Sequence, residues 1–100
     1  MSNWQERVEK WAEDRNLIKG STAALQLSKL LEEIGELATA VAIGDYDGAL
    51  DGIGDACVVL TVMAKQLDSS LSECQETAWD EIKDRRGRLV DGVFVKELGV

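Results

Sequence analysis

No proline interrupts these hundred residues, and along most of the chain apolar side chains recur at the three- and four-residue spacing of amphipathic helices. Glycine and hydroxyl or acidic residues interrupt this pattern at Gly20, Gly44 and Asp68-Ser69-Ser70, which are typical positions for helix ends. Because the connections are short, neighbouring helices should pack antiparallel. The sequence therefore predicts a single all-α domain over residues 1–100.

Four helices are expected before Gly87, over about residues 3–16, 22–43, 45–67 and 72–86. Capping boxes at Ser2-Asn3-Trp4-Gln5 and Ser72-Glu73-Cys74-Gln75 should open the first and the last of them. The turn at Lys19-Gly20-Ser21-Thr22 should supply a hydroxyl cap for the second helix, and Asp45 or Asp47 should cap the third. Gly87 is expected to be the left-handed cap that ends the fourth helix.

Residues 88–96 alternate with period two around Asp91-Gly92, which predicts a short hairpin or an extended C-terminal arm. The uncharged run 56–64 has apolar side chains pointing in nearly all directions around its helix. A helix that is apolar all round must be enclosed on every side, so we expect a homodimer or a tetramer that associates through the helices. Nine residues are too few to cross a bilayer.

Composition restricts the chemistry. The chain has no histidine, which excludes Ser-His and Cys-His nucleophile pairs and imidazole metal ligands. With 19 acidic and 11 basic residues the net charge is -8, which argues against a general partner of nucleic acid or of a membrane surface. Two cysteines make no disulfide framework, and the charged N-terminal stretch is unlike a signal peptide, so a cytoplasmic location is expected.

The second predicted helix carries a polar edge. At 100° per residue, Gln26, Lys29, Glu33 and Glu36 lie beside the apolar stripe, whereas Glu32 turns further toward solvent. An acidic cluster of this kind is as typical of a solvated helix face as of a binding site. The predicted apolar stripe consists of Leu30, Ile34, Leu37 and Val41.

The third predicted helix places Asp51 and Asp55 on the same face as Val58 and Val62. Two carboxylates aligned with a core stripe require a cation or a basic side chain, because an unpaired buried charge is costly. Hard oxygen ligands without soft ones favour Mg²⁺ or Mn²⁺. The glycines beside this acidic pair, Gly52 and Gly54, indicate either a frayed helix start or a close approach to the backbone.

These residues resemble the MazG-like branch of the all-α nucleoside triphosphate pyrophosphohydrolases. The similarity lies in Glu32-Glu33-Ile34-Gly35-Glu36 and Asp51-Gly52-Ile53-Gly54-Asp55, with Gln26 and Lys29 ahead of them and residues 80–87 and 92–96 behind. The commoner family form has glutamate at the position of Gly52. Asp51 resembles the substitute found in compact, phage-type members.

The resemblance implies a four-helix MazG-like bundle that hydrolyses a nucleoside triphosphate to the monophosphate and pyrophosphate with Mg²⁺, for which Mn²⁺ could substitute. It implies Glu33, Glu36 and Asp55 as metal ligands together with Asp51. Glu32 would be either a ligand or a base that orients the attacking water, and Glu33 belongs to the same catalytic pair. Substrate-binding candidates are Gln26 and the basic residues Lys29, Lys83 and Arg86, the last two of which would also complement a helix dipole.

Two rival functions remain open from the sequence. One is a non-catalytic helical interaction module, whose acidic residues serve solubility. The other is a degenerate homologue that binds nucleotide or metal without turnover. Trp4 and Trp11 are interpreted as core residues in preference to base-stacking platforms.

Overall fold

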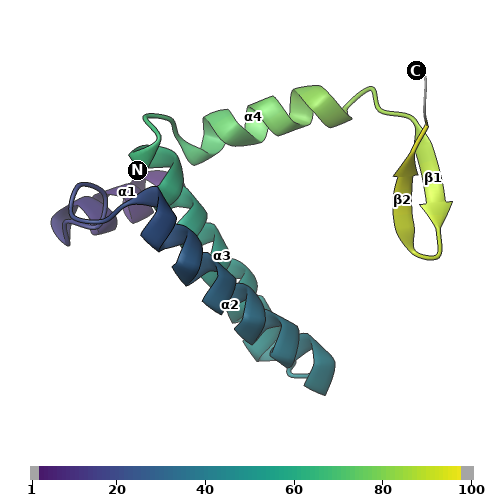
Figure 1. Ribbon diagram of the computed structural model, residues 1–100, viewed down its shortest axis with the longest axis horizontal. Coiled ribbons are helices and arrows are strands. Elements are labelled where there is room, and N and C mark those ends of the chain that lie inside the picture. The colour runs from purple at the N-terminus through teal and green to yellow at the C-terminus, as the bar shows by residue number, and fades with distance from the viewer. Residues whose placement is uncertain (1–2, 98–100) are drawn as a thin grey trace.

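The computed structural model describes residues 3–97, which form four helices and one antiparallel hairpin. Helices α2 and α3 run antiparallel as a long pair, α1 packs on α3 near its C-terminal end, and α4 leaves that end and diverges from the pair (Figure 1). The predicted mostly helical fold with four helices is confirmed. Their bounds are α1 (Trp4–Asp14), α2 (Ala23–Ile43), α3 (Tyr46–Gln66), α4 (Leu71–Ile82), β1 (Gly87–Val90) and β2 (Val93–Lys96).

Local capping chemistry positions α2 and α3 as expected, whereas the N-cap of α1 is Asn3, one residue after the start of the predicted capping box. Side-chain oxygens of Asn3, Thr22 and Asp45 each accept a hydrogen bond from the backbone N–H three residues ahead, at 2.9, 3.1 and 3.0 Å. Gly44 ends α2 in the left-handed region, with φ of 74°. The capping role expected of Ser2 lies outside the described residues.

Both predicted ends of α4 are wrong. The cap is Ser70, whose hydroxyl oxygen accepts from the Glu73 N–H at 3.2 Å, whereas Ser72 lies inside the helix. The helix ends at Ile82, and Gly87 begins β1 in place of capping a helix. Strand pairing decides this end, because the Arg86 carbonyl just before β1 accepts a hydrogen bond from the Glu97 N–H at 2.8 Å.

The predicted hairpin is confirmed. Leu89 pairs with Phe94 in the antiparallel register. Asp91 and Gly92 form the connection, and both have positive φ, of 51° and 80°. This combination is that of a type I′ turn, whose twist suits a two-residue hairpin.

The core between α2 and α3 is narrow. The face of α2 that packs against α3 carries the buried Glu33 and Ala40 and the half-buried Leu30 and Leu37. Gly52 makes the close approach possible, because a Cβ added there would lie 3.1 Å from the Cβ of Leu37. The group that approaches the backbone at Gly52 is therefore Leu37 of the neighbouring helix α2. At Gly54 there is no such approach, because a Cβ added there would meet nothing within 4 Å.

A second apolar face of each long helix has no partner within the described chain. Ile34 and Val41, expected in the same stripe as Leu30 and Leu37, are 45% and 65% exposed. They continue a heptad-spaced row on α2, and α3 carries a similar row. We call these rows the outer apolar stripes; their members are Leu27, Leu31, Ile34 and Val41 of α2, and Tyr46, Leu50, Ile53 and Leu60 of α3.

Helix α4 does not close a four-helix bundle. The backbone N–H of Ser72 donates to the Gln5 side chain of α1 at 2.6 Å, but beyond this contact α4 and the hairpin extend away, and none of their described residues is buried (Figure 1). The radius of gyration is 16.2 Å, against about 13 Å for a compact chain of this length. The accessible surface is 7560 Å², against about 5,600 Å² for a compact monomer of this mass.

Among residues 3–97, no helix is both long enough and apolar enough to span a membrane.

Candidate functional site: a carboxylate pocket

A pocket of about 780 Å³ opens where α1, α2 and α3 meet. Helix α2 lines it with Gln26, Lys29 and Glu33, and α3 faces these residues with Asp55 and Val58. Three of the four residues on the predicted polar edge of α2 therefore line one cavity. The predicted alignment of Asp55 with the valines of α3 is also found.

The buried acid of the pocket is Glu33, whose side chain is 10% exposed. Its Oε1 lies 3.2 Å from the Nζ of Lys29, one turn earlier on α2. The Nζ of Lys29 also lies 3.8 Å from Oε2 of the exposed Glu32. The hydrogen bond to Glu33, followed by the charges of Glu32 and Glu33, raises the pKa of Lys29 above its ordinary value.

Asp55 lies between two other carboxylates. Burial raises the pKa of Asp55 above its ordinary value, and the negative charges of Asp51 and Glu33 raise it further. Hydrogen bonding of the Asp55 carboxyl with Glu33 and Asp51 acts in the same direction. Acids from α2 and α3 thus repel one another at the mouth of this pocket, a condition that a cation would relieve.

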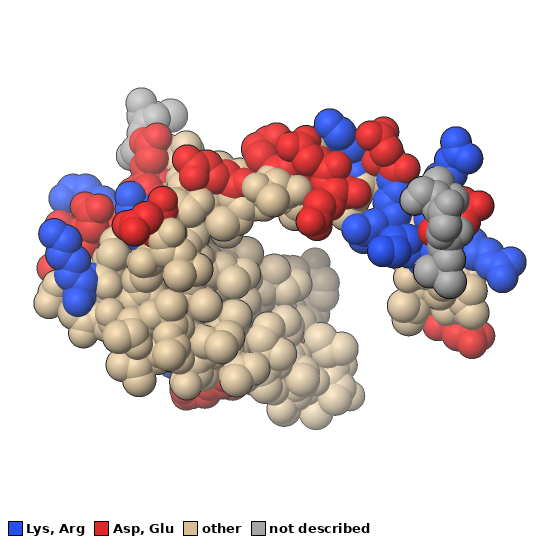
Figure 2. All heavy atoms as spheres, turned by 45° about the horizontal axis from the view of Figure 1, so that its top comes forward, with Lys and Arg blue, Asp and Glu red and all other residues tan. Residues whose placement is uncertain are grey.

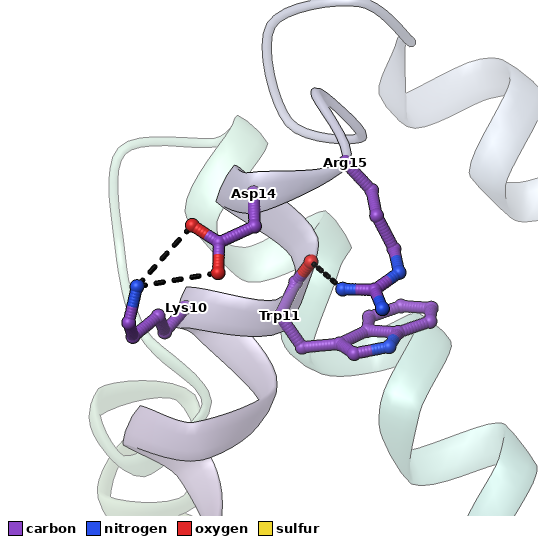
Figure 3. A network of polar contacts seen from close by, with 4 residues as sticks. All are labelled: Lys10, Trp11, Asp14 and Arg15. Carbon is purple, nitrogen blue, oxygen red and sulfur yellow. Dashed lines mark hydrogen bonds and ion pairs between the residues drawn. The ribbon is translucent and has the colours of Figure 1, made fainter.

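The opposite wall is aromatic. Trp4 and Trp11 of α1 line the pocket and are 40% and 43% exposed, so the prediction that they are enclosed core residues is wrong. The Arg15 guanidinium lies over the Trp11 ring at 4.7 Å from its centroid and donates to the Trp11 carbonyl oxygen at 3.1 Å (Figure 3). On the other side of α1, Lys10 pairs with Asp14 at 3.2 Å. The contacts of Arg15 fix the indole that forms part of the pocket wall.

Other predicted site residues lie outside the pocket lining. Glu36 and Asp51 are exposed on their helices. The charge of Glu36 contributes to the raised pKa of Lys29, and the charge of Asp51 contributes to the raised pKa of Asp55. Lys83 follows α4, where its Nζ lies 3.2 Å from an Asp80 carboxylate oxygen, and Arg86 precedes β1. Within this chain the structure does not bring Lys83 and Arg86 to the carboxylate pocket (Figure 1).

Sequence reasoning missed the contribution of α1 to this site. Trp4, Arg7 and Trp11 all line the pocket, and they lie three and four residues apart on α1. An arginine inside an aromatic stripe at helical spacing was the available signal, since a helix face that packs only against a core does not need a charge.

The donor set of the pocket suits a hard divalent cation, since it consists of carboxylates from two helices. Within residues 3–97, however, no three His, Cys, Asp or Glu side chains are arranged so that they could hold a metal ion. The carboxylates meet in pairs around Asp55, while Lys29 pairs with Glu33. Coordination would therefore require the side chains to turn toward a common point.

Comparison with known proteins identifies a phage relative. The chain is 48% identical over 68 residues to a Haemophilus phage HP1 protein described as an uncharacterized 18.2 kDa protein in the rep-hol intergenic region. The match covers 66% of this chain and 42% of the relative, so the chain spans less than half the length of that protein. No family model matches the chain. No solved structure matches it either.

Proposed function

We propose that the protein is a Mg²⁺-dependent nucleoside triphosphate pyrophosphohydrolase of the MazG-like kind. The observation that carries this proposal is the pocket itself, in which Glu33 and Asp55 face each other across two helices with Lys29 beside them and an indole wall opposite. This arrangement offers separate surfaces for a polyphosphate and for a flat base. The motif resemblance supplies the reaction, release of pyrophosphate from the triphosphate.

Each residue has a distinct role in this proposal. Glu33 and Asp55 would hold the metal, with the exposed Asp51 and Glu36 turning in from the rim, and Glu32 would orient water. When bound, Mg²⁺ or Mn²⁺ supplies neutralisation of phosphate charge and a lower pKa of bound water. Lys29 would release Glu33 and pair with a phosphate oxygen, which is a comparable partner for an ammonium group. Gln26, whose Nε2 donates to the Ser21 Oγ at 3.1 Å, lines the substrate side.

The aromatic wall supports a nucleotide in particular. A nucleobase can stack on an exposed indole, and such stacking contributes about 1–3 kcal/mol per base. Arg15 covers one face of the Trp11 ring, and both Trp11 and Trp4 line the pocket and remain partly exposed. An inorganic polyphosphate would use the carboxylate side alone.

We further propose that the working form is a homodimer, or a tetramer built from dimers, associated through the outer apolar stripes. The chain exposes about 2,000 Å² more surface than a compact monomer of its mass. A standard interface buries about 800 Å² on each partner, and obligate interfaces bury more. The excess is therefore of the size that a stable dimer removes from water.

The deciding experiment is a pyrophosphate-release screen across ribo- and deoxyribonucleoside triphosphates with Mg²⁺. Asp55→Asn and Glu36→Gln should lose turnover while keeping the helical circular dichroism of the wild type. Asp68→Asn provides the matched control, because it makes the same chemical change in the turn after α3, away from the pocket. Equal activity of wild type, Asp55→Asn and Glu36→Gln would remove the proposed site.

Thermal stability separates the rival functions. A ligand at 100 times its dissociation constant adds about 2.7 kcal/mol to the free energy of unfolding. Stabilisation by Mg²⁺ plus nucleotide without pyrophosphate release would favour a degenerate nucleotide-binding homologue. No stabilisation and no release would favour the non-catalytic interaction module.

A further inference from the structure

Within the structure of residues 3–97, the C-terminal arm, which we define as residues 71–96, has no buried residue. Its helix α4 carries an apolar row that ends in Trp79 and Ile82, which are 54% and 49% exposed. The hairpin that follows exposes Leu89 and Phe94, at 74% and 50%. Side chains of this size on a separate helix and hairpin are expected to be covered by another surface in the folded assembly.

The far part of the arm is also the basic part of an acidic protein. Segment 83–96 carries five basic residues and two acidic ones, whereas the whole chain has a charge of -8. Figure 2 shows the separation, with acidic side chains along α4, basic side chains gathered toward the hairpin, and a broad uncharged face on the helical pair. The basic residues are Lys83, Arg85, Arg86, Arg88 and Lys96.

The lining of the carboxylate pocket has two acidic residues, Glu33 and Asp55, and two basic ones, Lys29 and Arg7, and three more acids, Glu32, Glu36 and Asp51, are exposed around it. The charges of Glu33 and Asp51 act on Asp55, and those of Glu32, Glu33 and Glu36 act on Lys29. The basic residues that line the pocket are Lys29 and Arg7, and a triphosphate bound beside these acids would gain from further positive charge. The arm of the same chain does not provide it, because α4 carries the arm away from the pocket (Figure 1).

We infer that the arm acts on a second copy of the chain: in the homodimer, the apolar row of α4 lies against the partner, and Lys83, Arg86 and Arg88 reach the mouth of the partner's carboxylate pocket, where they bind substrate phosphates. This inference rests on the proposed function for its ligand, but the placement of the arm does not. An exchanged arm explains together why the chain is extended, why no residue of α4 is buried, and why the basic end of the arm is separated from the acids.

The placement is tested without any reaction. Wild-type protein labelled with ¹⁵N is mixed in equal amount with unlabelled protein, exchanged, and treated with a carbodiimide that joins lysine to carboxylate without a spacer. We expect Lys83 or Lys96 to be joined to acids of the pocket rim in peptides of mixed isotope. Lys29 joined to Glu33 or Glu32, in peptides of one isotope, is the internal control. If the control forms and the arm lysines join rim acids only within one isotope, or join none, the inference is overturned.

The role in the site is tested by subunit complementation. Asp55→Asn removes a proposed metal ligand from the pocket and leaves the arm unchanged. The double variant Lys83→Ala/Arg86→Ala removes two cations from the arm and leaves the pocket unchanged. Each alone should be inactive or strongly impaired. After mixing and exchange, half of the dimers are mixed and each has one intact site assembled from both chains, so about a quarter of the wild-type rate should return.

The outcomes separate the two proposals. Impaired variants that show no recovery on mixing, with exchange confirmed by the isotope experiment, would place the arm cations on their own chain and overturn the inference. If wild type releases no pyrophosphate from any nucleotide, the proposed function fails, and the cross-linking result alone decides whether the arm is exchanged. Lys10→Ala serves as a control variant, because it removes a lysine that pairs with Asp14 on α1, outside the pocket lining.

Discussion

The Nζ of Lys29 lies 3.2 Å from Oε1 of Glu33, and the two side chains have opposite environments, with Lys29 51% exposed and Glu33 10% exposed. The ion pair thus joins a cation at the pocket mouth to a carboxylate held between α2 and α3. Burial of a carboxylate is costly without a partner, and Lys29 supplies one to Glu33.

Replacing Lys29 with glutamine should lower the thermal midpoint of the metal-free protein by a small amount, because the pair is partly screened by solvent. The pKa of Lys29 is raised in the folded state above the ordinary 10.5. Its stabilisation is therefore fully present below pH 10.5 and is lost as the pH rises through the raised value. Thermal melts of both proteins should differ at neutral pH and converge at strongly alkaline pH. A constant difference at all pH values would contradict the role of the charge.

Asp55→Asn should raise the thermal midpoint in metal-free buffer at neutral pH. The folded-state pKa of Asp55 is raised above the ordinary 3.8, so the ionised carboxylate destabilises the fold relative to a neutral group. Stability contributed by the protonated form is present below pH 3.8 and is lost as the pH rises through the raised value. The advantage of the Asp55→Asn variant over the wild type should therefore vanish at acidic pH, which thermal melts across the pH range will measure.

Addition of Mg²⁺ provides the second half of that test. Wild type should gain stability from the metal and Asp55→Asn should gain less, which reverses their order if the acids hold the ion. Melting curves with and without Mg²⁺, with Ca²⁺ as the comparison ion, measure this directly. An equal gain in both proteins would place the metal elsewhere.

Gly52→Ala and Gly54→Ala should have opposite effects although the residues lie two positions apart on α3. A Cβ at Gly52 would lie 3.1 Å from the Leu37 Cβ and 3.3 Å from its Cα, atoms that cannot swing aside. We expect a loss of about 1–3 kcal/mol from overpacking. A Cβ at Gly54 meets nothing within 4 Å, so the higher helix propensity of alanine should add up to about 1 kcal/mol. Urea unfolding of the two variants makes the comparison.

Ile34→Glu should prevent formation of the proposed homodimer without unfolding the helices. Ile34 is 45% exposed within one chain and belongs to the outer apolar stripe of α2, so a charge there is tolerated by the monomer and opposed by an apolar interface. Ser28→Glu is the matched control on the same helix, exposed and outside the stripe. Sedimentation equilibrium should give a monomer for Ile34→Glu and a dimer for Ser28→Glu. A dimer in both would exclude the stripe from the interface.

The sequence by itself determined the elements whose causes are local. Thr22, Asp45 and Gly44 fix helix ends through hydrogen bonds and backbone conformation within a few residues, and Asp91-Gly92 fixes the hairpin in the same way. Local reasoning failed at the end of α4, because the decisive contact there joins Arg86 to Glu97 across the hairpin.

Only the tertiary structure decided which faces of the helices meet. Angular projection describes positions around one helix, but it does not say where the neighbouring helix lies, and α2 has apolar side chains on two faces. The contact of Leu37 with Gly52 selects one of them, and this choice buries Glu33 while leaving Glu36 exposed. The same packing leaves Ile34 outside, and the direction in which α4 leaves the helical pair separates Arg86 from the pocket lining (Figure 1). Both outcomes follow from contacts between residues far apart in the chain, which no local pattern contains.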